Sequence, residues 1–279
     1  MKVAVTGATG FVGRHVVSAL LARGVEVVAA TRKPNQTETL DSSLTIVSID
    51  IADPVNAFAR MGRPDVLLHL AWGGLPNFRS EAHIENELPL QIRFLDACAD
   101  SGLKRLVVTG TCLEYGMQSG CLDEKIQTAP ITSYGQAKDR LRVHLEKLTN
   151  DGGPELTWAR LFYLYGPGQA STSLYSQLRT AVSSGATEFP MSPGDQQRDF
   201  LPIETAAAHL IALAIDSPDA GVVNICSGVP RAVSALTHDW LLEWGADITL
   251  KPGVYPYPDF EPHAFWGCTK KLDTLLGII

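Results

Sequence analysis

The sequence predicts an α/β protein with a doubly wound, parallel sheet of the Rossmann type and a small C-terminal lobe. Short apolar runs rich in β-branched residues alternate with segments of helical periodicity through the first 165 residues. This alternation is typical of parallel strands that are joined by helices. The first run passes directly into the glycine-rich stretch Gly7-Ala8-Thr9-Gly10-Phe11-Val12-Gly13, and a helical pattern follows. Strand, glycine turn and helix in this order form the setting that a dinucleotide-binding fingerprint requires.

The expected elements follow one another along the first half of the chain. Parallel strands that are buried on both faces are nearly continuous apolar runs. Such runs predict strands at 3–6, 25–30, 44–48, 65–71, 103–109 and 156–162. Helical spacing of apolar residues predicts helices after Val12, from about 81 to 100, and from 134 to 147. Pro89 lies inside the second of these helices, so a kink or a break is expected near it.

The character of the sequence changes after Tyr165-Gly166-Pro167-Gly168. Proline and glycine become denser, and the expected elements are helices at 174–182, 204–215 and 233–244 and a strand at 221–225. We therefore divide the chain into a dinucleotide-binding domain at 1–165 and a lobe at 166–279 that covers the sheet edge. Few residues remain for this lobe, so it is expected to be partly interleaved with the first part and not to fold independently.

Composition and charge exclude several classes of function. The 279 residues are 45% hydrophobic and 19% charged, and the formal net charge of −7 gives no electrostatic footprint for nucleic acid. The five cysteines lack zinc-like spacing, so no metal site is expected, and reduced thiols favour a cytoplasmic protein. The sequence shows neither a signal peptide nor an apolar run long enough for a bilayer, so no membrane partner is expected. A homodimer is left open.

The glycine stretch indicates where the pyrophosphate of a cofactor would bind. Glycines let the backbone approach the phosphates, and the N-terminus of the helix offers free N–H groups. The spacing is Gly-x-x-Gly-x-x-Gly, which differs from that of ordinary Rossmann dehydrogenases.

The residues after the second expected strand bear on the choice between NAD and NADP. NAD enzymes usually carry an acid about twenty residues past the glycines, whereas this chain has Thr31 followed by Arg32 and Lys33. A guanidinium can bind a 2′-phosphate, so we favour NADP over NAD; the alternative is that both cations are solvated loop residues.

A second pattern, Ser133-Tyr134-Gly135-Gln136-Ala137-Lys138, opens the helix expected at 134–147. Tyr134 and Lys138 are about one helical turn apart, so their side chains leave the same face of the helix. A nearby ammonium favours phenolate and is expected to lower the pKa of Tyr134, which would let the phenol exchange a proton near neutral pH. By itself the pattern also fits a surface Tyr and a surface Lys on an amphipathic helix.

Taken together, these segments resemble the extended short-chain dehydrogenase/reductase family, which contains nucleotide-sugar epimerases, dehydratases and ketoreductases. The matching motifs are Thr6-Gly7-Ala8-Thr9-Gly10-Phe11-Val12-Gly13, Asp50-Ile51, His69-Leu70-Ala71, Asn86, Thr111 with Tyr115-Gly116, Tyr134-x-x-x-Lys138, Arg160-Leu161-Phe162, Tyr165-Gly166-Pro167-Gly168 and Arg198-Asp199-Phe200. The stretch 110–116 and the tail Phe265-Trp266-Gly267 look most like the 4-ketoreductases that act on dTDP- or GDP-linked 4-keto-6-deoxyhexoses.

The resemblance implies a role for each of a set of residues. Tyr134 would donate a proton to the reacting oxygen, Thr111 would hydrogen-bond the same oxygen, and Lys138 would hold the nicotinamide ribose. The implied cofactor contacts are Gly7, Thr9, Gly10, Phe11, Val12, Thr31, Arg32, Asp50, Ile51, Leu70, Ala71, Thr109, Tyr134, Lys138, Leu161 and Phe162. The implied substrate contacts are Trp72, Thr111, Cys112, Tyr134, Tyr163 and Arg198, with Arg198 on the substrate diphosphate.

Several of these residues have an alternative interpretation. Trp72 stands where the family usually has a small residue, and it can narrow the sugar pocket or form a wall of the core. Arg198 can instead form a structural pair with Asp199, and Glu114 can touch a sugar hydroxyl or stand in water. Tyr163 replaces an asparagine that contacts substrate in epimerases, which weakens the epimerase hypothesis. Packed or surface positions, not ligand positions, are expected for His69, His209 and His263.

The leading hypothesis is a reductase in which NADPH delivers hydride to a keto carbon while Tyr134 protonates the oxygen. One rival is a nucleotide-sugar 4-epimerase that keeps NAD tightly bound. A second is an NADP-binding sensor without turnover, which the presence of Thr111, Tyr134 and Lys138 argues against. A third keeps the reductase chemistry but gives it a carbonyl substrate that is not a sugar.

Overall fold

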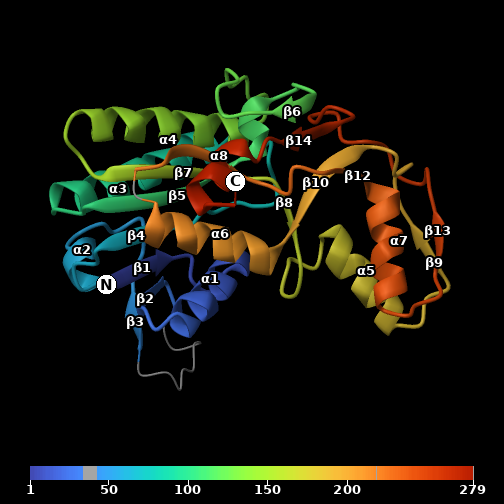
Figure 1. The fold of residues 1–279 in the computed structure, drawn as a ribbon, viewed down its shortest axis with the longest axis horizontal. Helices are drawn as coiled ribbons and strands as arrows, with labels where there is room; N and C mark the ends of the chain where they lie inside the picture. The colour runs from blue at the N-terminus through green and yellow to red at the C-terminus, as the bar shows by residue number, and fades with distance from the viewer. Residues whose placement is uncertain (34–42, 218, 279) are drawn as a thin grey trace.

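The central feature of the computed structural model is a parallel sheet of seven strands in the order β11-β7-β5-β4-β1-β2-β3 (Figure 1). The structure describes residues 1–33, 43–217 and 219–278. All neighbouring strands of this sheet are parallel, which confirms the predicted fold class. The order reverses between β1 and β4, and open α/β sheets bind ligands at such a switch point. The strands are β1 (Lys2–Thr6), β2 (Glu26–Thr31), β3 (Leu44–Ser48), β4 (Val66–His69), β5 (Arg105–Thr111), β7 (Glu155–Leu161) and β11 (Gly221–Ile225).

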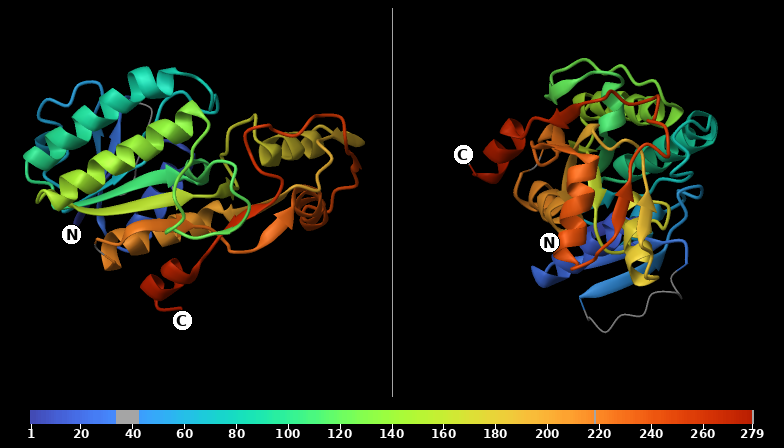
Figure 2. Two further views of the ribbon diagram at one scale, coloured as in Figure 1. Left: turned by 90° about the horizontal axis from the view of Figure 1, so that it is seen from above. Right: turned by 90° about the vertical axis from the view of Figure 1, so that its right-hand side faces the viewer.

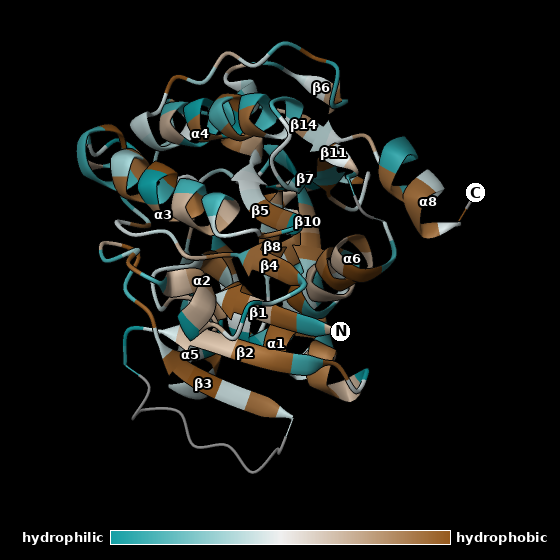
Figure 3. Cartoon of the chain, turned by 90° about the vertical axis from the view of Figure 1, so that its left-hand side faces the viewer, coloured by the Kyte–Doolittle hydropathy of each residue, from teal (hydrophilic) through white to brown (hydrophobic). Residues whose placement is uncertain are grey.

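Helices cover both faces of the sheet and create two apolar cores (Figures 1 and 2). On one face α1 and α6 bury Val16 and Leu210 against the strands, and on the other face α3 and α4 bury Phe94 and Leu141. Figure 3 shows the mostly brown, hydrophobic strands between these helices. Coverage on both sides is the reason that the strand sequences are almost wholly apolar. The helices are α1 (Phe11–Ala22), α2 (Ala57–Arg60), α3 (Leu88–Asp100), α4 (Ser133–Asn150) and α6 (Ile203–Asp216), with α8 (Lys270–Leu276) beside β11.

The helix expected from about 81 to 100 is interrupted near Pro89, as predicted. A turn of π-helix, η2 (His83–Glu87), leads into α3, and Pro89 lies in the first turn of α3. Proline is tolerated in a first turn because the N–H that it lacks would have no intrahelical partner there. The interruption brings His83 beside Trp72, whose Nε1 donates to the His83 Nδ1 at 3.1 Å.

The lobe extends beyond the carboxyl ends of the strands and has its own small core (Figure 1). β10 lies between β8 and β12, and β9 pairs with β13. Rings from Tyr165, Tyr175, Trp240 and Trp244 pack together between α5 and α7. The lobe elements are β8 (Tyr163–Tyr165), α5 (Leu174–Ser183), β9 (Glu188–Pro190), β10 (Gln197–Pro202), β12 (Pro230–Ala232), α7 (Val233–Glu243) and β13 (Thr249–Lys251).

The chain passes between the central sheet and the lobe several times. α6 and β11 follow the first lobe elements in sequence but pack on the central sheet. The short helix η3 (Cys112–Tyr115) follows β5, and β6 (Gly120–Leu122) pairs with β14 (Phe265–Gly267), a strand that comes after the lobe. β10 ends at Pro202 and α6 begins at Ile203, so these two elements are joined without a linker residue.

Two further properties concern only the residues that the structure describes. Within 1–33, 43–217 and 219–278, no group of three or more His, Cys, Asp or Glu side chains is arranged to hold a metal ion. In the same ranges, none of the helices combines the length and the apolar character that crossing a bilayer demands. The five cysteines are free thiols, and three of them, Cys98, Cys112 and Cys226, are buried.

Candidate active site

The turn between β1 and α1 requires glycine for two different reasons. Gly7 has a φ of +67°, and a Cβ there would lie 2.9 Å from the backbone nitrogen of Ala71. A Cβ on Gly13 would lie 2.1 Å from the carbonyl oxygen of Gly7. Gly10 precedes α1 and supplies no side-chain cap to it. The first N–H groups of the helix therefore remain available to an anion.

A cavity of about 580 Å³ lies at the switch point of the sheet, a size typical of small-molecule sites. The glycine turn and the ends of β1, β2 and β4 form its walls. The predicted cofactor contacts that line it are Gly7, Thr9, Gly10, Thr31, Arg32, Asp50, Ile51, Leu70 and Ala71, together with the predicted substrate contact Trp72. The lining formed by the described residues leaves out Phe11, Val12, Thr109, Tyr134, Lys138, Leu161 and Phe162.

The end of β2 carries the residues on which the cofactor preference depends. Arg32 and Lys33 are exposed, and both line the cavity with Thr31. The Thr31 Oγ1 accepts a hydrogen bond from the Lys33 N–H at 3.3 Å. The carboxylate of Asp50 accepts from the Ala52 N–H at 3.0 Å. The cavity wall at β2 thus presents a guanidinium, a group that can bind a phosphate in bidentate fashion.

Local hydrogen bonds fix the start of α4 and with it Tyr134. The Thr132 Oγ1 accepts from the Gly135 N–H at 3.1 Å and caps the helix. The Tyr134 N–H donates to the Phe78 carbonyl oxygen at 3.0 Å. A Cβ on Gly135 would lie 2.8 Å from the Leu113 carbonyl oxygen, so α4 packs directly on η3. Tyr134 therefore lies beside the segment that follows β5.

Lys138 is buried one turn further along α4, and its ammonium is held from two sides. Nζ donates to the Thr109 carbonyl oxygen at 2.7 Å and lies 4.0 Å from the centre of the Trp72 ring. Burial disfavours the charged form and lowers the pKa of Lys138 to about 7. The contact with the Trp72 ring opposes this effect, because a cation is attracted to the face of an indole. Trp72 also lies edge-on to the Tyr134 ring, with ring centres 5.8 Å apart.

The expectation that Lys138 lowers the pKa of Tyr134 is wrong for this structure. Burial raises the pKa of Tyr134 above its usual value, and the charge of Glu114 acts in the same direction. The Lys138 Nζ is 5.9 Å from the centre of the phenol ring, and burial also disfavours its charge. The desolvation penalty of the phenolate is therefore larger than its stabilisation by the Lys138 ammonium. The phenol is therefore protonated near neutral pH, which is the form that can donate a proton.

The depressed pKa of Lys138 predicts a dependence of stability on pH. The pKa is about 7 in the folded protein and 10.5 ordinarily, so between these values the unfolded chain binds more protons. The free energy of unfolding of the wild type should therefore rise with pH relative to Lys138→Met, by up to about 1.4 kcal/mol per pH unit. Urea unfolding at pH 7, 8 and 9 measures this difference. Lys147→Met, on the exposed end of the same helix, is the control and should show no such slope. A constant difference between wild type and Lys138→Met would contradict the burial argument.

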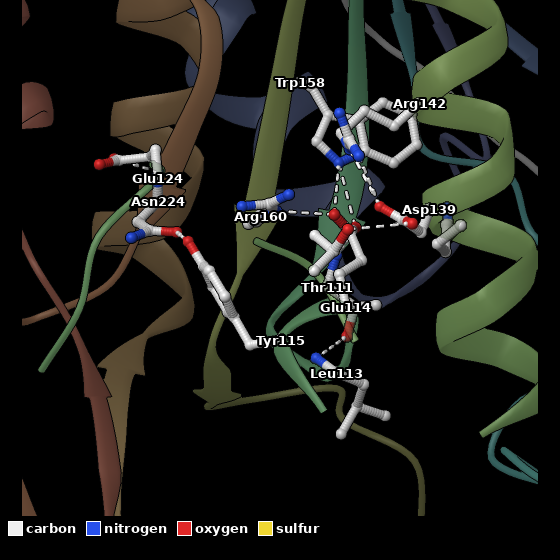
Figure 4. A network of polar contacts seen from close by, with 12 residues as sticks. Thr111, Leu113, Glu114, Tyr115, Glu124, Asp139, Arg142, Trp158, Arg160 and Asn224 are labelled. Carbon is white, nitrogen blue, oxygen red and sulfur yellow. Dashed lines mark hydrogen bonds and ion pairs between the residues drawn. The ribbon is translucent and has the colours of Figure 1, made fainter. Parts of the chain in front are cut away.

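Thr111 ends β5 and is tied to a buried polar network (Figure 4). Its Oγ1 accepts from the Leu113 N–H at 3.3 Å, while its own N–H donates to the Glu114 carboxylate at 2.8 Å. These reciprocal bonds form a capping box at the start of η3. The Thr111 hydroxyl takes part only in the first of these bonds and acts there as an acceptor, so its hydrogen remains available to a substrate oxygen.

Glu114 is the centre of this network. The two environments expected for its carboxylate, a sugar hydroxyl or water, are both wrong. The side chain is fully buried, and its carboxylate accepts from the Arg160 Nε at 2.7 Å and the Trp158 Nε1 at 3.0 Å. A Cβ on Gly110 would lie 2.2 Å from the Trp158 Nε1 and 2.4 Å from the Glu114 Oε1. Glycine at position 110 is therefore required for this contact. Glu114 stabilises the segment of Thr111 from inside and is closed off from solvent.

The other predicted substrate contacts lie on three different elements. Cys112, the first residue of η3, is only 5% exposed. Tyr163 begins β8, and Arg198 is the second residue of β10. Both of these side chains contact one carboxylate, that of Glu261: the Tyr163 hydroxyl donates to it, and the Arg198 Nη2 is 3.0 Å from it.

The alternative pairing of Arg198 with Asp199 is wrong. The Asp199 carboxylate accepts from the backbone N–H groups of Ser227 at 2.6 Å and Gly228 at 2.9 Å, and it therefore fixes the turn after β11. The sequence does not indicate Glu261 as the partner of Arg198, because the two are separated by 63 positions. The role of Glu114 could have been found, since Thr111-x-x-Glu114 has the spacing of a capping box.

The three histidines are packed or lie at the surface, as expected. His69 is 1% exposed, its Nδ1 is 2.9 Å from the Thr6 Oγ1, and burial lowers its pKa to about 4. His209 is half-buried. His263 is exposed and lies 3.3 Å from the carboxylate of Asp195.

The switch-point cavity, the uncapped start of α1 and the buried Tyr134 and Lys138 together define a dinucleotide-dependent enzyme of the Rossmann class. The model of the NAD dependent epimerase/dehydratase family matches residues 3–226. The chain belongs to this family, an extended short-chain dehydrogenase/reductase family, and it is an NAD(P)-dependent enzyme.

The similarity to known proteins covers nearly the whole chain. A protein of Aggregatibacter actinomycetemcomitans named dTDP-6-deoxy-L-talose 4-dehydrogenase (NAD(+)) is 29% identical over 271 residues, which cover 96% of this chain and 99% of that protein. A dTDP-6-deoxy-L-talose 4-dehydrogenase (NAD(P)(+)) of Kitasatospora kifunensis is 29% identical over 268 residues, with coverages of 92% and 83%. The solved structure of MoeE5 in complex with UDP-glucuronic acid and NAD is 25% identical, with a TM-score of 0.82 and coverages of 99% and 93%.

Proposed function

We propose that the protein is an NAD(P)-dependent reductase of the 4-keto group of a nucleotide-linked 6-deoxyhexose. The observation that carries this proposal is the buried pair Tyr134 and Lys138, one helical turn apart on a helix that packs on η3, the segment beginning after Thr111. Two relatives are named 4-dehydrogenases of dTDP-6-deoxy-L-talose, and oxidation at position 4 is the reverse of a 4-keto reduction. Their names favour a dTDP-sugar over a GDP-sugar.

Each side chain has one task in the proposed reaction. The nicotinamide, when bound, supplies a hydride. Tyr134, kept protonated by burial, donates a proton to the oxygen of the reacting carbonyl. Thr111 donates its hydroxyl hydrogen to the same oxygen, since its Oγ1 already accepts from Leu113. Lys138 binds the nicotinamide ribose, with its ammonium anchored on the Thr109 carbonyl oxygen.

The remaining candidates divide between the cofactor and the sugar. We assign the residues lining the switch-point cavity to the cofactor, and Leu161 and Phe162 to its nicotinamide end. Trp72 contacts both the cavity and the ring of Tyr134, so it limits the space for the sugar on that side. Cys112 and Tyr163 are assigned to the sugar, and Arg198 to the diphosphate.

Turnover with defined substrates tests the proposal. Oxidation of NADPH and NADH is followed with dTDP- and GDP-linked 4-keto-6-deoxyhexoses, and the products are identified by NMR. The expected result is one 4-hydroxy sugar formed for each cofactor oxidised. Interconversion of 4-epimers without added cofactor would assign a 4-epimerase, cofactor binding without turnover a sensor, and equal rates on uncharged ketones a general carbonyl reductase.

The proposed preference for NADP(H) predicts a selective effect at Arg32. Arg32→Ala should weaken binding of NADPH about tenfold, because one charge-assisted contact to the 2′-phosphate is lost, and should leave NADH nearly unchanged. Fluorescence titration with both cofactors measures the dissociation constants. Arg23→Ala serves as the control. It removes an exposed arginine at the C-terminus of α1, whereas the cavity lies at the N-terminus of that helix. Equal affinity of the wild type for NADPH and NADH would contradict the preference.

A further inference from the structure

One carboxylate contacts both of the lobe side chains that are assigned to the substrate. Glu261 accepts a hydrogen bond from the Tyr163 hydroxyl. It also pairs with Arg198, at 3.0 Å from Nη2 and 3.2 Å from Nε. The exposed fractions are 4% for the Arg198 side chain and 10% for that of Glu261. The pair is therefore largely shielded from water. In such a buried environment charge-assisted hydrogen bonds are stronger than at the surface.

The guanidinium of Arg198 has little capacity left for a second anion. Its Nη1 donates to the carbonyl oxygens of Gln197 at 2.9 Å and His263 at 3.0 Å. Its Nε and Nη2 donate to Glu261, and the Phe265 ring centre lies 4.8 Å from its central carbon. These bonds use four of the five N–H groups that a guanidinium carries. A diphosphate cannot bind the Nε–Nη2 edge in bidentate fashion while Glu261 remains on it.

Glu261 belongs to segment 252–263, which joins β13 to β14 (Figure 1). The segment contains neither helix nor strand, and residues 252–259 are exposed. Beyond Glu261, Asp259 pairs with Arg79 at the surface, with exposed fractions of 75% and 57%, and the Phe260 ring lies 6.0 Å from that of Phe78. Exposed ion pairs contribute little to stability. Backbone bonds tie both ends of the segment to the lobe: the Val254 N–H donates to the Met191 carbonyl oxygen at 2.9 Å, and the Gln197 N–H donates to the His263 carbonyl oxygen at 2.9 Å. The stretch between these two bonds, which contains Glu261, can move while the sheet and the core of the lobe stay in place.

We propose that Glu261 is an internal competitor for Arg198: the diphosphate of the substrate takes the Nε–Nη2 edge, and the stretch of chain around Glu261 moves away from it while His263 stays in place. This inference rests on the proposed function, which assigns that diphosphate to Arg198. The two anions cannot share the edge, because they repel each other and need the same donors. Displacement of Glu261 also frees the Tyr163 hydroxyl, which becomes a second donor for the ligand.

The competition predicts tighter anion binding when the carboxylate is neutralised. Glu261→Gln should bind inorganic pyrophosphate and dTDP about tenfold more tightly than the wild type, the size of one charge-assisted contact. Isothermal titration calorimetry at a fixed ionic strength, on the full chain, measures both dissociation constants. Asp259→Asn removes the same charge from the same segment without touching Arg198, and it should stay within about twofold of the wild type. In an Arg198→Met background, Glu261→Gln should change neither constant.

A second measurement on the wild type tests the movement itself. Tyr255 and Tyr257 are 53% and 39% exposed and provide chymotrypsin sites within segment 252–263. If the segment leaves Arg198, saturating pyrophosphate should accelerate cleavage there, because proteolysis reports local opening. Protection of these sites by pyrophosphate would overturn the proposal, even if Glu261→Gln failed to fold.

The outcomes distinguish this inference from the proposed function. Equal or weaker pyrophosphate binding by Glu261→Gln overturns the competition and assigns Glu261 to holding Arg198 in place, whether or not the wild type reduces a nucleotide sugar. Tighter pyrophosphate binding by this variant supports the competition even if no nucleotide-linked ketone is reduced. In that case the proposed function alone fails.

Discussion

Replacing Tyr134 by phenylalanine is expected to lower kcat by about 10²–10⁴, the usual contribution of a general acid. The substitution removes the hydroxyl alone and keeps the ring, which packs against Trp72 and Phe78. The dissociation constant of the cofactor should therefore stay within about twofold, since binding and proton donation are separate tasks. Single-turnover oxidation of NADPH, together with a titration of cofactor binding, measures both quantities.

Tyr175→Phe makes the same chemical change in the aromatic cluster of the lobe, where the Tyr175 ring packs against Trp240 and Trp244. This control should retain wild-type turnover. Turnover by Tyr134→Phe within about twofold of the wild type would remove Tyr134 from the mechanism and leave the proposed reaction without a proton donor.

Replacing Glu114 by glutamine should cause the largest loss of stability among the substitutions considered. The Glu114 and Arg160 side chains are 0% and 2% exposed, so the variant leaves a buried guanidinium without its counter-ion. Breaking a buried pair by removing one partner typically costs about 3–5 kcal/mol. The free energy of unfolding in urea measures this loss. Because Glu114 also accepts from the Thr111 N–H, a loss of turnover should accompany the loss of stability.

Two comparisons show whether the stranded charge is the cause. Glu155→Gln breaks an exposed ion pair with Arg105. The Glu155 and Arg105 side chains are 48% and 30% exposed, so this substitution should lower the free energy of unfolding by at most about 1 kcal/mol. Combining Glu114→Gln with Arg160→Met removes both charges and should recover part of the stability. If the double variant is less stable than Glu114→Gln by the full cost of Arg160→Met alone, the two side chains act independently and the explanation is wrong.

The sequence was sufficient for the architecture because its signals are local. All seven strands of the central sheet were expected from apolar runs, including β11, and Pro89 marked the interruption before α3. The glycine turn was equally clear, since the positive φ of Gly7 and the close approach at Gly13 are requirements of the backbone itself. Each of these features depends on residues within a few positions of one another.

The electrostatics of the site could not be obtained in this way. The pKa of Tyr134 depends on how completely the fold removes water from the phenol. The spacing in the sequence predicts that Lys138 is nearby, but it does not predict this burial. The motif Arg198-Asp199-Phe200 likewise indicates Arg198, but nothing near it in the sequence indicates Glu261, its partner 63 positions away. For Glu114 the expected partners were a sugar hydroxyl or water, whereas its partners Trp158 and Arg160 come from β7, more than 40 positions further along the chain.

The direct join of β10 to α6 at Pro202 and Ile203 has a mechanical consequence. Two-part enzymes often close by rotation about flexible connections, which absorb the change in backbone angles. Here Arg198 stands five positions before the first residue of a helix that is buried against the central sheet, and the residues between them belong to β10, so no flexible loop separates the two. A rigid-body swing of the lobe about this point would have to break α6 away from its core. The displacement of Glu261 that we propose therefore involves local rearrangement of surface chain, with the rest of the lobe as a fixed frame.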